Sequence, residues 1–221
     1  MTARRLLGGL TALLAWTALI IQFGLHLTSG VDINGAPRTV AMSIVDYFGY
    51  FTILTNLLVA IVLTGPMLAP GGAWARWADD LRTTWTTAAA ILVVGVAYHV
   101  LLSATYDPVG LAAVTDLLFH YIVPSLYVAY WIAFTDVREA RWTRFAPVLS
   151  VYPTAYFTYL VVRGQVIGTY PYFFVDVRTL GLLGAFRNAM AILAFYLFVA
   201  WVIALVAGRV GARRGAVAHR G

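Results

Sequence analysis

Four polar residues within apolar stretches of this sequence have the types and spacing of a nucleophile–base site. Asp116 and His120 are four residues apart, so on a helix they share a face, and the carboxylate can hold the imidazole in one tautomer. Thr52 and Asn56 share a helical face in the same way, which places an amide beside a hydroxyl. These residues are the parts of a nucleophile–base site, with Thr52 as the candidate nucleophile and His120 as the candidate base.

The elements that must position these residues are helices that cross a membrane. The chain is 62% hydrophobic and 11% charged, whereas about a quarter of the residues of a soluble domain are charged. Six stretches reach the roughly 20 apolar residues that a helix needs to span a bilayer. The sequence therefore predicts an all-α fold, a polytopic bundle of six transmembrane helices in a single domain (1–221). The predicted helices are 6–27, 40–65, 85–105, 110–134, 145–162 and 180–207.

The distribution of arginine predicts how this bundle is oriented. All 15 basic residues are arginine. Eleven of them fall in the N-terminal segment, in the second and fourth loops, or in the C-terminal tail that ends with Arg220. Because cytoplasmic segments of membrane proteins carry an excess of positive charge, both termini are expected in the cytoplasm.

The polar residues within the predicted helices gather towards the outer side of the membrane. At 1.5 Å per residue, Asp116 lies about 9 Å, His120 about 15 Å and Thr52 about 18 Å from the outer ends of their helices. His99 lies about 9 Å from the outer end of the third helix, and Arg187 lies in the outer half of the sixth. Polar groups are costly in the hydrocarbon region, so this bias predicts a polar cavity that opens outwards.

Each candidate has an expected role in that cavity. Thr52 and His120 are the expected catalytic pair, since they lie at similar depth on helices that run in the same direction. Asp116 is expected to orient His120. Asn56, Arg187 and His99 are expected to support the site by orienting groups or by stabilising negative charge. Thr158 is a rival nucleophile, but no histidine stands at a matching helical spacing.

Other classes of site leave little trace in the sequence. There is no cysteine and no phosphate loop, metal-ligand cluster or nucleic-acid motif, so we expect no metal, no cofactor and no nucleic-acid partner. Three alternatives stay open. The first is a small transporter or proton-coupled membrane protein that uses Asp46, Asp116 and His120 as a relay. The second is a haem electron carrier with His99 and His120 as axial ligands, and the third is a non-catalytic scaffold. The oligomeric state, and whether the second and fourth helices touch, also stay open.

Several short segments resemble the bacterial branch of the androgen-induced-gene membrane protein family. The likeness lies in residues 50–59 (YFTILTNLLV), 120–124 (HYIVP), 162–164 (VRG) and 170–177 (YPYFFVDV). Animal members of this family are intramembrane threonine hydrolases of fatty acid esters of hydroxy fatty acids. The resemblance implies a bacterial cytoplasmic-membrane enzyme with Thr52 as nucleophile and His120 as base, and a lipid or fatty-acyl ester drawn from the bilayer as substrate. Thr55 and Asn56 stand where other polar residues are expected in the animal branch.

Overall fold

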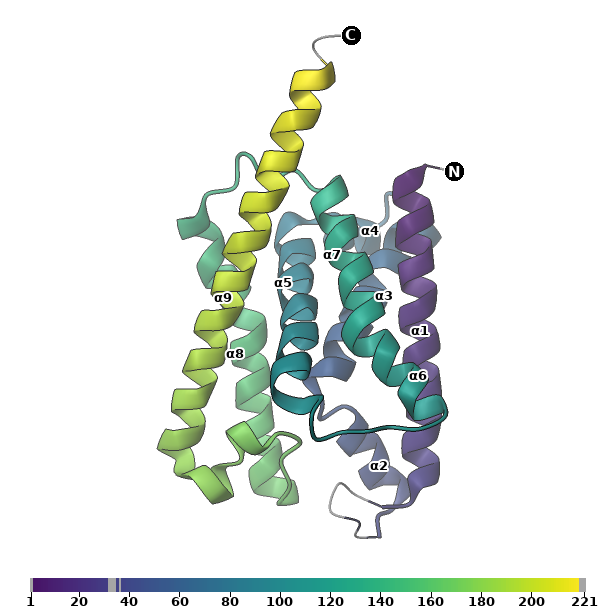
Figure 1. The fold of residues 1–221 in the computed structure, drawn as a ribbon, viewed down its shortest axis with the longest axis vertical. Helices are drawn as coiled ribbons and strands as arrows, with labels where there is room; N and C mark the ends of the chain where they lie inside the picture. Colours follow the sequence, from purple (N-terminus) through teal and green to yellow (C-terminus); the bar gives the residue numbers. More distant parts are fainter. Residues whose placement is uncertain (1, 32–34, 36, 219–221) are drawn as a thin grey trace.

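The chain folds into a bundle of helices (Figure 1). The computed structural model describes residues 2–31, 35 and 37–218, so Arg220 of the basic tail lies outside the described residues. Six helices in this part of the chain are long and apolar enough to cross a membrane. They are Ala3–Ser29, Phe51–Leu68, Leu81–Leu102, Leu111–Phe134, Trp142–Ile167 and Val177–Ala212. The predicted fold class, an all-α bundle of six membrane-spanning helices, is thereby confirmed.

The helices run alternately up and down the bundle. Both ends of the chain lie at the same end (Figure 1), which we call the terminal end, and the opposite end is called the distal end. The elements in chain order are α1 (Ala3–Ser29), α2 (Val40–Tyr47), α3 (Phe51–Leu68), α4 (Ala73–Asp79), α5 (Leu81–Ala97), η1 (Tyr98–Leu102), α6 (Leu111–Leu117), η2 (Leu118–Ile122), α7 (Val123–Phe134), α8 (Trp142–Ile167), η3 (Phe173–Val175) and α9 (Val177–Ala218). Helix α5 lies at the centre, where it packs against α3, α7, α8 and α9.

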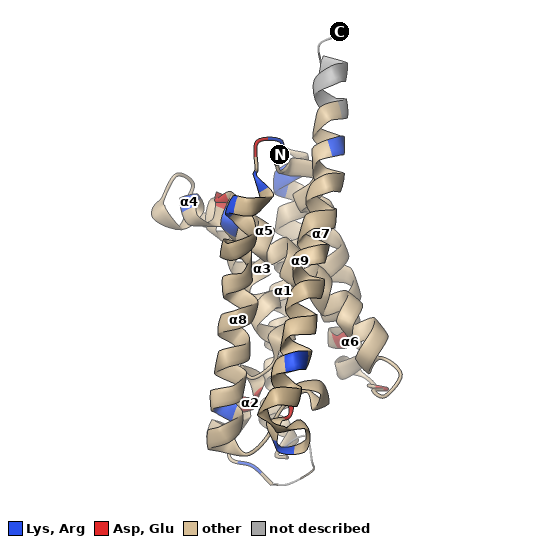
Figure 2. Cartoon of the chain, turned by 90° about the vertical axis from the view of Figure 1, so that its left-hand side faces the viewer, with Lys and Arg blue, Asp and Glu red and all other residues tan. Residues whose placement is uncertain are grey.

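Charged residues lie mainly towards the two ends of the bundle, with a band that is largely uncharged between them (Figure 2). This distribution matches helices that cross a hydrocarbon layer, in which charged side chains are costly. The core of the bundle is built from small and aromatic side chains. Ala88, Ala89 and Ala90 of α5 are fully buried, and Trp85 stacks obliquely near Trp131 with ring centroids 5.9 Å apart. Small residues on α5 therefore let the surrounding helices approach closely.

The prediction of one continuous helix over 40–65 is wrong. The chain forms α2 and α3 with a break over 48–50, where Tyr50 is extended at φ −89° and ψ 130°. Gly49 lies at this break, and a Cβ atom there would lie 2.9 Å from Nε of Arg163. A side chain at position 49 would therefore have to displace the Arg163 guanidinium, which glycine avoids.

Tyrosines supply the hydrogen bonds that the break removes. Tyr156 donates its hydroxyl proton to the carbonyl oxygen of Gly49 at 2.8 Å, and Tyr159 donates to that of Phe48 at 3.3 Å. On the other side of the break, the Phe51 N–H donates to the hydroxyl of Tyr172 at 3.1 Å. A break within an apolar bundle requires such partners, because unpaired backbone groups are costly there. These tyrosines therefore hold α3 so that it begins at Phe51.

Two π-helical segments lie at the same level on neighbouring spans. Segment η1 continues α5 and carries Tyr98 and His99, while η2 joins α6 to α7 and carries His120. The backbones approach closely here, since a Cβ atom on Gly95 would lie 2.7 Å from the carbonyl oxygen of His120. Single π-helical turns rotate the residues that follow and are frequent at functional sites. In this chain they turn Tyr98 and His120 towards each other.

Candidate functional site

The structure brings together Thr52 and His120, which the sequence pairs only by depth. The Thr52 Oγ1 atom lies 3.5 Å from Nε2 of His120. Thr52 is the second residue of α3, and His120 is the middle residue of η2. The second and fourth predicted helices therefore do touch, through α3 and η2. The distance is at the long end of hydrogen bonding, and catalytic hydrogen bonds often tighten only when substrate binds.

Asp116 fixes the other side of the His120 ring. The Nδ1 atom of His120 lies 3.0 Å from the Asp116 backbone carbonyl oxygen and 3.0 Å from its carboxylate Oδ1. The alignment of the ring N–H favours the carbonyl oxygen, so the carboxylate contributes mainly its charge. Because both neighbours of Nδ1 are acceptors, the proton resides on Nδ1 and leaves Nε2 free to accept a proton from Thr52.

Tyr98 completes this arrangement from η1. Its hydroxyl donates to Oδ2 of Asp116 at 2.8 Å, and its ring lies flat against the imidazole of His120, with centroids 3.6 Å apart and planes 8° apart. The His120 and Asp116 side chains are only 12% and 14% exposed. Asp116 thus contacts His120 through its backbone carbonyl and Tyr98 through its carboxylate, and the stacked Tyr98 ring restricts rotation of the His120 imidazole.

The hydroxyl of Thr52 lies beside the N-terminal turn of α3 and beside Tyr172. The break at Gly49 leaves the first N–H groups of α3 without partners in their own helix, and the dipole of the helix makes this end partly positive. Burial raises the pKa of the Tyr172 hydroxyl, and hydrogen bonding with Thr52 and with the Phe51 backbone opposes that rise. Tyr172 therefore remains a protonated donor next to Thr52 at neutral pH.

A cavity of about 430 Å³ opens beside Thr52. Its walls come from α5, η1, α8, η3 and α9, and nearly all of the lining side chains are apolar. Thr52, Tyr98 and Tyr172 are among its few polar lining residues. An apolar space of this size with a few convergent polar groups is typical of a site for a small apolar ligand.

Other candidates from the sequence lie outside this arrangement. Asn56 is fully buried and donates to the carbonyl oxygens of Thr52 at 2.9 Å and Phe119 at 3.4 Å, so its amide protons hold α3 against η2. Arg187 is exposed on α9 and makes no hydrogen bond or ion pair within the part of the chain that the structure describes. Neither residue lines the cavity beside Thr52. The expectation that they stabilise negative charge there has no geometric support.

His99 and Thr158 also point elsewhere. His99 is exposed, and its Nδ1 atom lies 3.2 Å from the hydroxyl of Tyr121. The π-helical turn of η1 places Tyr98, rather than His99, next to His120. Thr158 donates to the carbonyl oxygen of Thr154 within its own helix at 3.0 Å. The two histidines therefore contact different residues: His99 contacts Tyr121, whereas His120 contacts Asp116 and Thr52.

Asp46 belongs to a separate cluster of charges at the distal end. Its two carboxylate oxygens accept from Arg38, at 2.7 Å, and from Arg163. All three side chains are nearly buried, with 10% or less of each exposed. Both oxygens of Asp46 are thus engaged by guanidinium groups, whereas Asp116 is bonded to Tyr98.

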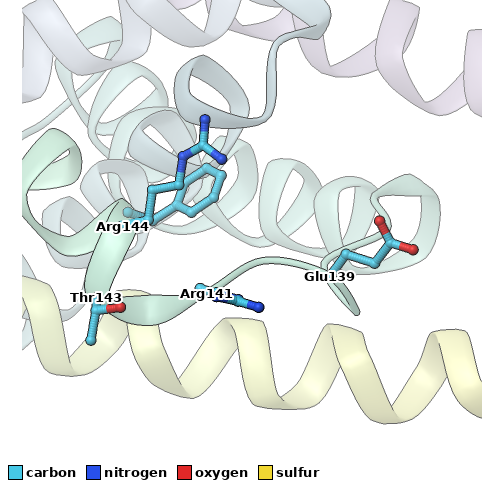
Figure 3. Close-up of a pocket in the computed structure, with 5 residues that line it drawn as sticks. Glu139, Arg141, Thr143 and Arg144 are labelled. Atoms are coloured by element: carbon cyan, nitrogen blue, oxygen red, sulfur yellow. The ribbon is translucent and has the colours of Figure 1, made fainter.

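A second hollow lies at the terminal end, between α7 and α8 (Figure 3). It encloses about 390 Å³ and is lined by Glu139, Arg141, Thr143, Arg144 and Phe145. No histidine is among these residues, so its threonine has no base of the kind that accompanies Thr52. Two of the lining residues, Arg141 and Arg144, are arginines of the predicted fourth loop. The hollow offers no nucleophile–base pair.

Two residues of the site escape a reading of the sequence. Tyr98 and Tyr172 look like ordinary aromatic residues near helix ends, where tyrosine is common in membrane proteins. Their positions depend on the π-helical turn of η1 and on the fold of the loop between α8 and α9, neither of which leaves a periodic signal. The one available hint is Gly49, whose place inside an apolar run marks a break.

Comparison of the chain with protein-family models, with curated proteins and with solved structures finds no match. The fold and the site geometry therefore carry the functional argument.

Proposed function

We propose that this protein is an intramembrane hydrolase of fatty-acyl esters, with Thr52 as nucleophile and His120 as base. The observation that carries the proposal is the contact between Thr52 Oγ1 and His120 Nε2, next to an apolar cavity that Thr52 lines. A nucleophile, a base and a group that orients the base are the parts that acyl transfer needs. The resemblance to the androgen-induced-gene family supports the same assignment, and with it a location in a bacterial cytoplasmic membrane.

The reaction follows from the geometry in two halves. Thr52 Oγ1 attacks the ester carbonyl carbon while its proton passes to Nε2 of His120, and the carbonyl oxygen takes up the negative charge. When this intermediate collapses, the C–O bond to the alcohol breaks, and the alcohol leaves with the proton from Nε2. Water then attacks the acyl-threonine with His120 again accepting a proton, which releases the fatty acid and restores the Thr52 hydroxyl.

Covalent labelling tests the nucleophile. A lipophilic fluorophosphonate should label the purified wild-type protein, because a P–O bond forms at Thr52 as fluoride leaves. Thr52→Ala should abolish labelling while the protein stays folded. Thr158→Ala is the matched control and should label normally, since Thr158 only bonds its own helix. Equal labelling of Thr52→Ala and wild type, or a folded wild type that does not label, would contradict the proposal.

The cavity gives a second prediction, on chain length. Ala189 of α9 lines the cavity and is 8% exposed. A phenyl group placed there should fill the space meant for the acyl chain. Ala189→Phe should therefore lower hydrolysis of long-chain esters about 10–200-fold, the usual effect of a misfit in an apolar pocket. Hydrolysis of acetyl and butyryl esters should stay within about twofold of wild type, because a short chain leaves that space empty.

Leu183→Phe is the control for this substitution, since Leu183 is on the same helix but is 72% exposed. Hydrolysis rates on a series of esters of increasing acyl chain length would show the length at which Ala189→Phe begins to lower activity. If Ala189→Phe reduced activity on short and long esters equally, the cavity would not be the acyl site.

A further inference from the structure

The loop between α8 and α9 places a tyrosine next to Thr52, and the reaction proposed for Thr52 and His120 gives this tyrosine no role. Tyr172 comes from this loop, lines the cavity together with Thr52, and accepts the Phe51 N–H at 3.1 Å. Its ring is held by Tyr50 in an edge-to-face contact at 6.1 Å and by Phe174 in a stacked contact at 5.2 Å. The hydroxyl is therefore fixed in place beside the reacting threonine.

Besides accepting the Phe51 N–H, the Tyr172 hydroxyl hydrogen-bonds with the hydroxyls of Thr52 and Tyr156. Neutral hydroxyls are weaker acceptors than an oxyanion, so the Tyr172 proton can pass from them to a negatively charged oxygen beside Thr52. An oxygen that accepts the Phe51 N–H still carries an O–H donor for a further oxygen. The acceptor expected beside Thr52 during the reaction is the ester carbonyl oxygen, which becomes negatively charged as Oγ1 attacks. Asn56 does not meet this need, because its amide protons are used by two backbone carbonyls.

We infer that Tyr172 is the oxyanion donor of this site, a catalytic residue that donates its hydroxyl hydrogen bond to the carbonyl oxygen in the tetrahedral intermediate. The positive end of α3, which begins at Phe51, adds to the same field. A donor aimed at charge that develops only in the transition state raises kcat more than it changes KM. This inference rests on the proposed hydrolase function.

Tyr172→Phe tests the inference, because it keeps the ring contacts and removes only the hydroxyl. We expect kcat for a fatty-acyl ester to fall about 10²–10³-fold with KM within a few-fold of wild type, as for the loss of one oxyanion donor. Tyr170→Phe is the matched control. Tyr170 is in the same loop and is 4% exposed, but its hydroxyl pairs with Gln165 and does not line the cavity. Tyr170→Phe should leave kcat within about twofold of wild type, because the Tyr170 hydroxyl is not near a reacting oxygen.

A pair of inhibitors separates an oxyanion role from a structural one. An alkyl trifluoromethyl ketone accepts the threonine oxygen and keeps negative charge on its former carbonyl oxygen, whereas the methyl ketone of the same chain stays neutral. Tyr172→Phe should weaken binding of the trifluoromethyl ketone by about the factor by which it lowers kcat/KM. The affinity for the methyl ketone should stay unchanged.

The inference is overturned if Tyr172→Phe keeps the wild-type kcat, or if it weakens both ketones equally, which would make Tyr172 a cap for α3 only. In either case, continued dependence of hydrolysis on Thr52 and His120 would leave the proposed function intact. A wild-type protein that neither hydrolyses esters nor binds the trifluoromethyl ketone would end both proposals.

Discussion

Replacing His120 with alanine is expected to lower ester hydrolysis by at least about 10⁴-fold, the scale on which loss of a triad residue acts. His120 is the only described side chain in hydrogen-bonding contact with Thr52 Oγ1 whose nitrogen can accept its proton. Without it, the threonine hydroxyl would have to attack in its protonated form. The measurement is the steady-state rate on a long-chain ester in detergent or liposomes, for wild type and variant at equal folded concentration.

Two comparisons make this prediction specific. His99→Ala should keep activity within about twofold, because His99 is exposed and contacts Tyr121 rather than the site. The double variant Thr52→Ala/His120→Ala should be no slower than either single variant, since residues that act as one unit are not additive. If the two losses multiplied, or if His99→Ala were as inactive as His120→Ala, the pairing of Thr52 with His120 would be wrong.

The sequence contains enough to predict the membrane-spanning helices and to pair Thr52 with His120 by depth, for a simple physical reason. Apolar runs long enough to cross a bilayer stand out in composition, and a polar residue inside such a run is costly enough to be conspicuous. Thr52 and His120 were found at similar depth by counting residues along two helices, and the structure places their side chains 3.5 Å apart. The spacing of Asp116 and His120 likewise predicted a contact that the structure contains.

What could not be predicted depends on departures from regular helices. A count at 1.5 Å per residue assumes an unbroken helix, whereas the chain breaks at Gly49 and passes through π-helical turns at Tyr98 and His120. These departures decide that Thr52 lies in the first turn of a helix and that Tyr98, not His99, contacts the imidazole. Arg187 shows the opposite error, because depth alone placed it near the site while its direction around α9 exposes it.

The largest expected effect on stability is at Asp46, where alanine should cost about 3–5 kcal/mol of the free energy of unfolding. The carboxylate accepts hydrogen bonds from Arg38 and Arg163, whose side chains are 7% and 5% exposed. Removing it would leave two buried guanidinium groups of like charge with no carboxylate between them. Thermal or denaturant unfolding in detergent measures the loss.

Asp79→Ala is the matched control for Asp46→Ala. Asp79 pairs with Arg4 at 2.7 Å, but the two side chains are 45% and 49% exposed, so water and salt screen the pair. Removal of the Asp79 carboxylate should lower the free energy of unfolding by less than about 1 kcal/mol. Equal stability of the two variants would show that the distal cluster does not hold the bundle together.

The same cluster links stability to the site. Arg163 packs on Gly49 at the break that precedes Thr52, so loss of Asp46 should loosen the start of α3 before the whole bundle unfolds. Asp46→Ala is therefore expected to lose ester hydrolysis at a temperature below its own unfolding transition, while Asp79→Ala should lose both together. The test compares residual activity with the folded fraction over one temperature series. If Asp46→Ala lost activity and folded structure at the same temperature, the charge cluster would stabilise the whole bundle and would not separately stabilise the start of α3 at Thr52.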